Sequence, residues 1–191
     1  MEARDERRMS VAEYVALDAA SEERWEYANG LAWASRGATP EHGIVTRNVI
    51  VQLTNGLAGR DCVAFPDGQK VSTPATEAYH YPDALVVCET PRYDERDPNA
   101  LVNPTLVVEV ASPTTADYDR GGKLSHYRTL ESFAEYVVVS WEARLVEHHR
   151  RVSADQWLVT LVRGGALPLD SIGIALDVDA LWTDLDRIRG A

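Results

Sequence analysis

The sequence predicts a mixed α/β (α+β) domain with a central sheet and helices packed against it. Short apolar runs at residues 62–65, 85–88, 106–111 and 136–140 are separated by polar, turn-forming segments, which is typical of strands. A helical pattern over residues 119–130 lies between the third run and the fourth. This order of strand, strand, helix and strand indicates a mixed sheet with helices packed on it.

The composition limits the classes of protein to which the chain can belong. The 191 residues fit one domain, residues 1–191, and we expect the first nine to be flexible. Hydrophobic residues make up 45% and charged residues 26%, which argues against disorder and coiled coil. The two cysteines, Cys62 and Cys88, are too few for a dense disulfide framework. Because no apolar stretch is long enough for a membrane helix and the start is charged, we expect a cytoplasmic, reduced protein without a membrane partner.

The first helix is marked by a capping-box pattern. Ser10 is followed three residues later by Glu13, and the apolar residues after it are spaced as on one helix face. This pattern predicts a helix over residues 10–19. A further helical turn is expected at residues 22–25.

A hairpin and a second helix are expected next. The turn signal Asn29-Gly30 joins residues 26–27 to residues 31–34, which predicts two antiparallel strands. Thr39 followed by Pro40 has the form of a helix cap with proline at the first helical position. The apolar residues from Ile44 to Leu57 then give this helix one hydrophobic face.

The remaining elements follow from the same signals. A polar, proline-bearing loop is expected at residues 89–104, between the second and third apolar runs. Residues 144–150 and 156–162 predict an additional hairpin. A last helical turn is expected at residues 177–181.

Two carboxylates occupy positions where apolar side chains are expected. Glu109 lies inside the apolar run 106–111, and burying an unpaired carboxylate costs several kcal/mol or shifts its pKa. Asp83 lies at the start of the preceding apolar strand. If the two strands are neighbours, both acids meet at one edge of the sheet, where a cation such as Mg2+ would offset their repulsion. The alternatives for Glu109 are a salt bridge or a hydrogen-bonded position near the end of the sheet, and the alternative for Asp83 is a turn or cap position.

Lys123 is the candidate basic group. It lies four residues before Tyr127, so the two side chains share one face of the predicted helix. A lysine beside a metal-bound water can orient or deprotonate the nucleophile and stabilise a pentavalent phosphate. A solvated helix face is the alternative for a lone lysine, and the preceding acidic strand favours the functional interpretation.

The chain resembles the Putative restriction endonuclease family within the PD-(D/E)xK nuclease superfamily, from about Ser10 to Leu181. The superfamily motif has a lysine two residues after the glutamate, where this chain has Ala111. The family is similar to members in which that lysine has moved to a following helix, so Lys123 is the natural substitute. Smaller departures are Val137, where the family often has Trp, and Leu31. The resemblance rests on the order and spacing of residues 24–30, 41–42, 81–83 and 108–115, of Asp119, Lys123 and Tyr127, and of residues 135–139.

The resemblance implies metal-dependent hydrolysis of DNA phosphodiester bonds on a restriction-endonuclease-like fold. Asp83, Glu109 and Lys123 would be catalytic. Asp83, Glu109 and the Val110 carbonyl would hold Mg2+ (or Mn2+), which would lower the pKa of a bound water. Glu26 would bind the metal directly or contact one of its ligands. The alternative is that Glu26 is only a carboxylate at the end of a helix.

Other residues are implied at the periphery of the site. His42, in the first turn of its helix, would touch phosphate or a metal-bound water, with a capping or structural role as the alternative. Asp119 and Tyr127 would contact phosphate or the metal ligands. A homodimer is expected, because a duplex cutter benefits from two sites related by a twofold axis.

A second class of function stays open. The net charge of -11 argues against strong nonspecific binding to phosphate backbones. Together with Ala111 in place of the motif lysine, it supports a nuclease-derived scaffold that binds nucleic acid or a protein partner and cuts weakly or not at all. It does not exclude DNA as a substrate, since a metal-loaded acidic site with a local basic rim can bind it.

Overall fold

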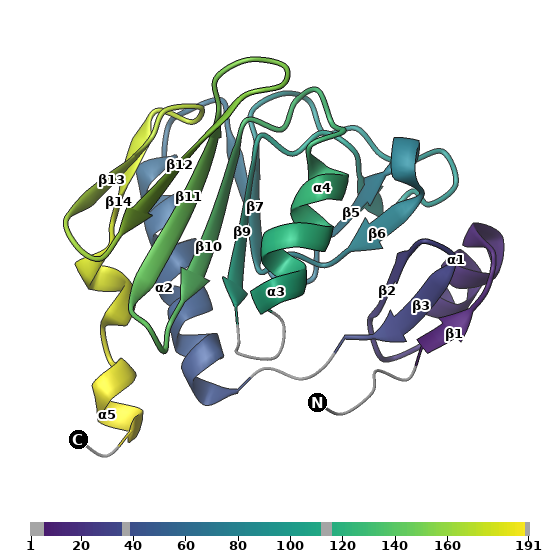
Figure 1. Cartoon of the computed structure of the whole chain (residues 1–191), viewed down its shortest axis with the longest axis horizontal. Helices are drawn as coiled ribbons and strands as arrows, with labels where there is room; N and C mark the ends of the chain where they lie inside the picture. The colour runs from purple at the N-terminus through teal and green to yellow at the C-terminus, as the bar shows by residue number, and fades with distance from the viewer. Residues whose placement is uncertain (1–5, 36–38, 112–115, 190–191) are drawn as a thin grey trace.

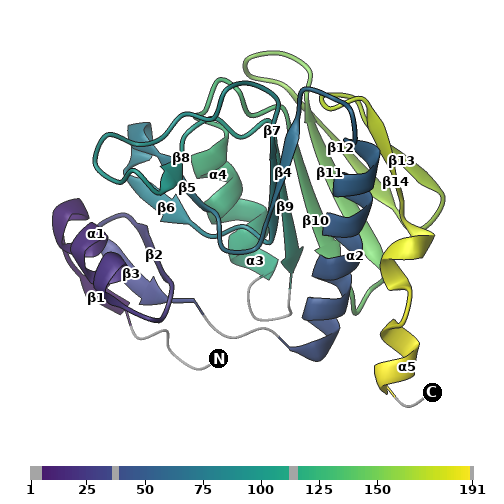
Figure 2. The same cartoon turned by 180° about the vertical axis from the view of Figure 1, so that it is seen from behind.

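The computed structural model describes residues 6–35, 39–111 and 116–189 of the chain, which form two six-stranded sheets and a two-stranded hairpin. Helix α2 covers one face of the larger sheet and helix α4 covers the other (Figures 1 and 2). The smaller sheet lies beyond α4, so that α4 is enclosed between the two sheets (Figure 1). The fold is therefore a mixed α+β architecture, as the sequence predicts.

The larger sheet is the mixed central sheet expected from the sequence. Its strand order is β12-β11-β10-β9-β7-β4. Only β9 and β10 run parallel, and the helical segment between them forms their crossover. The strands are β4 (Val63–Pro66), β7 (Ala84–Val87), β9 (Leu106–Ala111), β10 (Glu135–Ser140), β11 (Leu145–Arg151) and β12 (Trp157–Val162).

The smaller sheet was predicted only in part. Its strand order is β1-β3-β2-β6-β5-β8, and the expected hairpin forms its β2 and β3. Asn29 and Gly30 in the hairpin turn both have positive φ, at 55° and 79°. The strands are β1 (Glu6–Arg8), β2 (Trp25–Ala28), β3 (Leu31–Ala34), β5 (Lys70–Thr73), β6 (Ala78–His80) and β8 (Ala100–Leu101).

Three expectations about local structure are wrong. Residues 6–8 are not part of a flexible start, because they form β1 and pair with β3. Their sequence, Glu-Arg-Arg, lacks the apolar alternation that identifies a strand. The helical turn expected at residues 22–25 is absent, since Trp25 already begins β2. The loop expected at residues 89–104 contains the two-residue strand β8.

The two N-terminal helices begin where their caps predict. Helix α1 (Val11–Ala20) has the complete capping box, with the Glu13 amide donating to Ser10 and the Ser10 amide donating to Glu13. Helix α2 (Pro40–Gly56) starts after Thr39, which accepts from the His42 amide at 3.3 Å. The C-terminal elements are β13 (Ala166–Leu169), β14 (Ile174–Asp177), the 3-10 turn η3 (Asp179–Trp182) and α5 (Leu185–Arg189), and a further 3-10 turn, η1 (Pro74–Thr76), lies between β5 and β6.

The crossover helix differs from the continuous helix expected at residues 119–130. It consists of α3 (Ala116–Tyr118), a π-helical stretch η2 (Asp119–Lys123) and α4 (Leu124–Tyr127). Gly122 explains part of this geometry, because a Cβ there would lie 2.3 Å from the Tyr118 ring. Short π-helical stretches inside helices frequently occur at functional sites.

The hydrophobic core has one layer on each face of the larger sheet. Alternate residues of β9 point to opposite faces, so Val108 and Val110 pack with α2 while Val107 and Ala111 pack with α4. Glu109 lies on the α4 face and is 3% exposed. In the part of the chain that the structure describes, no helix is long and apolar enough to cross a membrane.

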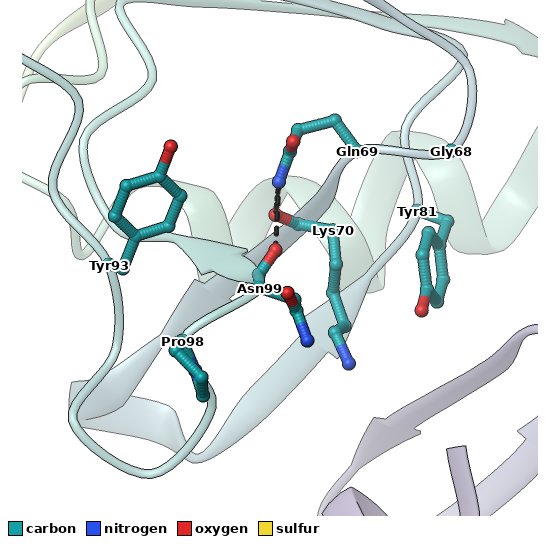
Figure 3. Close-up of a pocket in the computed structure, with 7 residues that line it drawn as sticks. All are labelled: Gly68, Gln69, Lys70, Tyr81, Tyr93, Pro98 and Asn99. Carbon is teal, nitrogen blue, oxygen red and sulfur yellow. Dashed lines mark hydrogen bonds between the residues drawn. The ribbon is translucent and has the colours of Figure 1, made fainter. Parts of the chain in front are cut away.

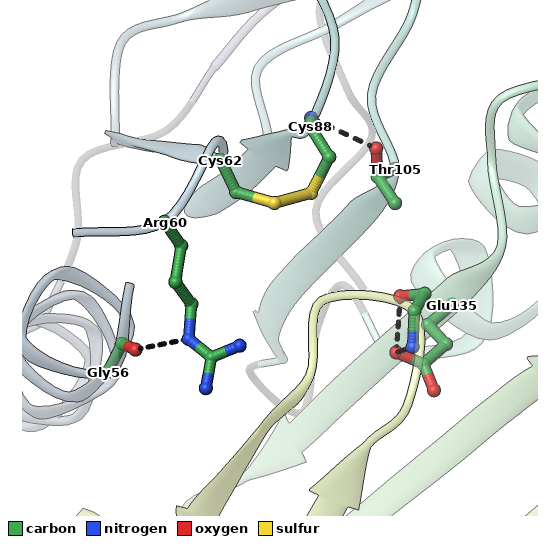
Figure 4. The surroundings of a disulfide bond; sticks show 7 residues. Gly56, Arg60, Cys62, Cys88, Thr105 and Glu135 are labelled. Atoms are coloured by element: carbon green, nitrogen blue, oxygen red, sulfur yellow. Dashed lines mark hydrogen bonds between the residues drawn. A yellow bond between two sulfur atoms is a disulfide. The ribbon is translucent and has the colours of Figure 1, made fainter. Parts of the chain in front are cut away.

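Cys62 and Cys88 are joined in a disulfide, which corrects the expectation of reduced cysteines (Figure 4). The two residues flank the paired strands β4 and β7, which brings them together although they are 26 residues apart in sequence. Strand pairing of this kind could not be read from two isolated cysteines. The bond fastens the short edge strand β4 to the sheet.

Removing the disulfide with the pair Cys62→Ser and Cys88→Ser is expected to lower the free energy of unfolding by about 3 kcal/mol. A closed loop of 26 residues restricts the unfolded chain on that scale. Urea unfolding of the oxidised protein and the double variant measures this difference. An unchanged midpoint would show that the two thiols are not bonded in the folded protein.

Candidate active site

Asp83 and Glu109 lie close together because β7 and β9 are neighbouring antiparallel strands. Ala84 pairs with Val108, so Asp83 and Glu109 lie one residue further along at the same edge. The Asp83 Oδ2 accepts a hydrogen bond from the Val110 amide at 2.7 Å. The sequence prediction that these two acids meet at one edge of the sheet is confirmed.

Lys123 reaches the same point from the crossover helix. Its Nζ lies 3.1 Å from Glu109 Oε2, 3.2 Å from Glu26 Oε1 and 3.4 Å from Asp119 Oδ1. The lysine is 7% exposed, so its contacts with these carboxylates are largely shielded from water. A lysine on this helix therefore contacts the strand glutamate, although position 111 holds alanine.

Glu26 joins the site from the smaller sheet. Its Oε1 accepts from the Tyr81 amide at 3.1 Å, and its Oε2 accepts from the Trp33 indole at 3.1 Å. With Lys123 as a third partner, both oxygens are engaged. The site is thus built from both sheets, with Lys123 bonded to an acid of each.

Tyr127 and Asp119 lie around Glu109 and Lys123. The Tyr127 hydroxyl donates to Glu109 Oε1 at 3.3 Å, so Lys123 and Tyr127 do share one helix face directed at Glu109. The backbone carbonyl of Asp119 accepts from the Tyr136 hydroxyl on β10 at 2.9 Å. This bond attaches the π-helical stretch to the sheet at the residue that faces Lys123.

The charges of this cluster shift one another's pKa values. Burial raises the pKa of Glu109 well above its ordinary value, and the charges of Asp119, Asp83 and Glu26 add to this while Lys123 opposes it. Burial alone would lower the pKa of Lys123, but its three carboxylate neighbours outweigh burial and raise it. Burial likewise opposes ionisation of Glu26, yet Lys123, His80 and the Tyr81 amide lower its pKa overall.

His42 pairs with Asp83 from the first turn of α2. Its Nε2 lies 3.0 Å from Asp83 Oδ1, and its Nδ1 lies 3.5 Å from the Thr46 hydroxyl. Burial would lower the pKa of His42, but the hydrogen bond and charge of Asp83 outweigh it and raise the pKa above 6.5. Both oxygens of Asp83 are therefore occupied, one by His42 and one by the Val110 amide.

The His42–Asp83 pair is expected to stabilise the fold more at low pH than at high pH. A raised histidine pKa means that its contribution is complete below the unfolded value of about 6.5 and is lost as pH rises through the folded value. His42→Gln should therefore lower the free energy of unfolding by roughly 1–2 kcal/mol at pH 5.5 and by less at pH 9. Urea unfolding at the two pH values measures this. In the contrasting control His126→Gln, burial lowers the histidine pKa to about 4, so at pH 5.5 the unfolded chain binds a proton that the folded protein does not. That substitution should therefore lower the free energy of unfolding less at pH 5.5 than at pH 9, the opposite of His42→Gln.

The donor set fits a hard divalent cation. Three carboxylates, those of Glu109, Glu26 and Asp119, contact one buried lysine, and Asp83 adds a further negative charge near Glu109, which leaves an excess of negative charge. Among the residues that the structure describes, no three His, Cys, Asp or Glu side chains are grouped so that they could hold a metal ion together. Mg2+ is typically held by one or two carboxylates and otherwise by water and substrate oxygens, so Asp83 and Glu109 suit it better than a closed cage for Zn2+.

A cavity of about 370 Å³ is lined in part by Tyr81, whose backbone amide donates to Glu26 (Figure 3). The groups in and around it already pair with one another, since Lys70 bonds Asp18 at 2.6 Å and the Gln69 amide donates to the Asn99 carbonyl at 2.9 Å. The Arg24 guanidinium carbon and Lys70 Nζ lie 5.8 and 5.7 Å from the centre of the Tyr81 ring. The lining residues are Gly68, Gln69, Lys70, Tyr81, Tyr93, Pro98 and Asn99.

Two residues next to the site were not predicted from the sequence to contact its acids. Trp33 bonds Glu26, and the hairpin turn at Asn29-Gly30 could have revealed it, because that turn sets Trp33 directly opposite Glu26. His80 is fully buried, with its Nδ1 3.9 Å from Glu26 Oε2, too far for a hydrogen bond. The only signal for His80 was its position three residues before Asp83.

Comparison with solved structures assigns the fold to the nuclease-like class. The chain superimposes with a TM-score of 0.75 on a crystal structure described as "a putative nuclease belonging to DUF820" from Anabaena variabilis. The match covers 93% of this chain and 99% of that one at 16% sequence identity.

The chain belongs to the Uma2 family, described as "Putative restriction endonuclease", whose model matches residues 11–179. Two proteins of Synechocystis sp. are similar along most of their length. The uncharacterized protein sll1609 is 30% identical over 156 residues, which cover 82% of this chain and 88% of that protein. The uncharacterized protein slr1290 is 30% identical over 179 residues, which cover 93% of each chain.

Proposed function

We propose that this chain is a metal-dependent endonuclease that hydrolyses DNA phosphodiester bonds with Asp83, Glu109 and Lys123. The observation that carries the proposal is the contact of Lys123 with Glu109 at 3.1 Å, beside Asp83 on the neighbouring strand. Membership in a family described as restriction endonucleases and a nuclease-like fold support it.

In this proposal Asp83 and Glu109, together with the Val110 carbonyl, would hold Mg2+ or Mn2+. The ion would supply Lewis-acid activation of the phosphate and a bound water of lowered pKa. Because Asp83 accepts from the Val110 amide, the strand backbone keeps the carboxylate beside the Val110 carbonyl. Tyr127 orients Glu109 through its hydroxyl.

Lys123 supplies the positive charge in the proposed reaction. Its raised pKa keeps it protonated at neutral pH, so it stabilises developing negative charge on phosphate and orients the attacking water as a donor. A neutral lysine acting as the general base is less compatible with three carboxylate neighbours. Glu26, whose Oε1 lies 3.2 Å from Lys123 Nζ, would position Lys123.

His42 would contribute at the entrance of the site. It lies in the first turn of α2, where the helix dipole favours phosphate. A protonated His42 beside Asp83 would donate to a phosphate oxygen. Asp119 would hold Lys123 in place from the helix.

The test is cleavage of supercoiled plasmid, single-stranded DNA and RNA with Mg2+, Mn2+ or EDTA, beside Asp83→Asn. Asparagine keeps an acceptor for the Val110 amide but removes the charge, so we expect a folded protein whose cleavage falls by at least about 100-fold. Equal rates in EDTA, or in the variant, would reject the proposal. If only RNA were cleaved, the proposed substrate would be wrong but the proposed site residues would stand.

The alternative function is a binding scaffold, and the bonded state of Lys123 is the observation that favours it. A lysine that contacts three carboxylates is equally compatible with an ion cluster whose role is purely structural. Binding of labelled DNA without cleavage, by a folded and Mg2+-saturated protein, would support the scaffold.

We also propose that the protein acts in the cytoplasm, where disulfides are rare. The Cys62–Cys88 bond makes this testable, because thiol titration of protein isolated under acid quench measures whether the two cysteines are bonded in the cell.

A further inference from the structure

The larger sheet ends on one side in a strand whose outer edge is open. Among the described strands, β12 pairs with β11 alone. The opposite edge strand, β4, is short, ends at Pro66 and is fastened by the disulfide at Cys62. Strand β12 is longer, with six residues, and none of them is charged or proline.

The side chains of β12 are also unusually apolar for an edge. Leu158, Val159 and Leu161 are 48%, 49% and 63% exposed, and Val152 in the preceding turn is 56% exposed. These four residues make up half of the exposed large hydrophobic residues in the described part of the chain. Soluble proteins normally protect such an edge with lysine, proline, a bulge or a covering element, because free backbone groups and apolar side chains recruit another strand.

We propose that β12 pairs antiparallel with β12 of a second copy, joining the two larger sheets into one continuous sheet. An identical strand can pair with itself antiparallel about a twofold axis, which gives a closed dimer. The occupant is a strand, because the open edge offers backbone donors and acceptors as well as apolar area.

Charge complementarity selects the register. With Val159 on the twofold axis, Trp157 lies opposite the partner's Leu161, and Asp155 lies opposite the partner's Arg163. Both Asp155 and Arg163 are exposed and flank the apolar strand. The opposite charges thus meet at both ends of the pairing, where cross-strand pairs of this kind are favourable.

The experiment measures the mass of the wild-type protein by sedimentation between about 1 and 100 µM, a range that covers moderate dimer affinities. We expect twice the 21.2 kDa chain mass for the wild type and the single-chain mass for Leu161→Lys. The matched control is Val51→Lys, since Val51 is 49% exposed but lies on α2. A monomeric wild type, or a Leu161→Lys variant that stays dimeric, would overturn the proposal.

Two further variants test the register. Asp155→Arg should weaken the dimer at least tenfold, and adding Arg163→Asp in the same chain should restore it, because the opposite charges are then exchanged. Val159→Cys should form an intermolecular disulfide on mild oxidation, while Val51→Cys should not, since facing residues of antiparallel strands are within disulfide range. A dimer without charge rescue or Val159 cross-linking would reject this pairing. None of these readouts depends on DNA cleavage, so they stand apart from the proposed function.

Discussion

Lys123→Met is expected to lower the free energy of unfolding by about 3–5 kcal/mol at neutral pH. The substitution keeps most of the side-chain volume but leaves Glu26, Glu109 and Asp119 without their shared countercharge in a buried site. Breaking a buried ion pair by removing one partner has a cost of this size, because the remaining charges are desolvated and unpaired. Urea unfolding at pH 7.5 measures it.

The controls for this prediction separate charge from packing. Lys123→Arg keeps the charge and should recover much of the stability, and it also remains measurable if the methionine variant fails to fold. Arg120→Met removes a cation from the same helix that is 35% exposed and pairs with Glu147, so it should cost less than about 1 kcal/mol. If Lys123→Met matched the wild type in stability, the three acids would have to be neutral in the folded protein.

Glu109→Gln is expected to change stability and cleavage in opposite directions. It removes one negative charge from a cluster that has more acids than bases, while Glu26 and Asp119 remain to pair with Lys123. We expect the free energy of unfolding of the metal-free protein to rise by roughly 0.5–2 kcal/mol, because substitutions that remove unfavourable interactions in an active site often stabilise the fold. Cleavage should be lost, because Glu109 is a proposed ligand of the ion. Thermal unfolding in EDTA and plasmid cleavage with Mg2+ measure the two effects.

The pH dependence gives this prediction a definite sign. The pKa of Glu109 is raised in the folded state, so the folded protein binds that proton more tightly than the unfolded chain. Wild-type stability therefore falls as pH rises from the unfolded value toward the folded one, and the advantage of Glu109→Gln should vanish near pH 4.5. The contrasting control is Glu135→Gln, because the Glu135 side chain is also inaccessible to water but has a lowered pKa, supported by His148 and Ser171. That variant should be destabilised, and a destabilised Glu109→Gln would contradict the account.

Much of the candidate site was predictable because its residues interrupt simple patterns. Glu109 is a charge inside an apolar strand, Asp83 precedes another such strand, and Lys123 and Tyr127 have helical spacing. Neighbouring strands and one crossover helix were enough to bring these four residues together. The predicted strand over residues 106–111 also has the observed bounds.

The smaller sheet could not be predicted in the same way. Its strands β5, β6 and β8 have four, three and two residues, too few for an alternating pattern to be recognised. Its parallel pairing of β5 with β8 joins segments that no turn signal connects. For this reason His80, which lies on β6 next to Glu26, was not identified from the sequence.

Building the site from two sheets has a consequence for how the protein is made. Lys123 is synthesised 97 residues after Glu26, and chains fold as they emerge N-terminus first. A nascent chain that ends before the crossover helix has the acids of both sheets but not the cation that joins them. The proposed DNA-cutting activity would therefore be withheld until the crossover helix has left the ribosome, which limits the exposure of the producing cell's genome to unfinished copies.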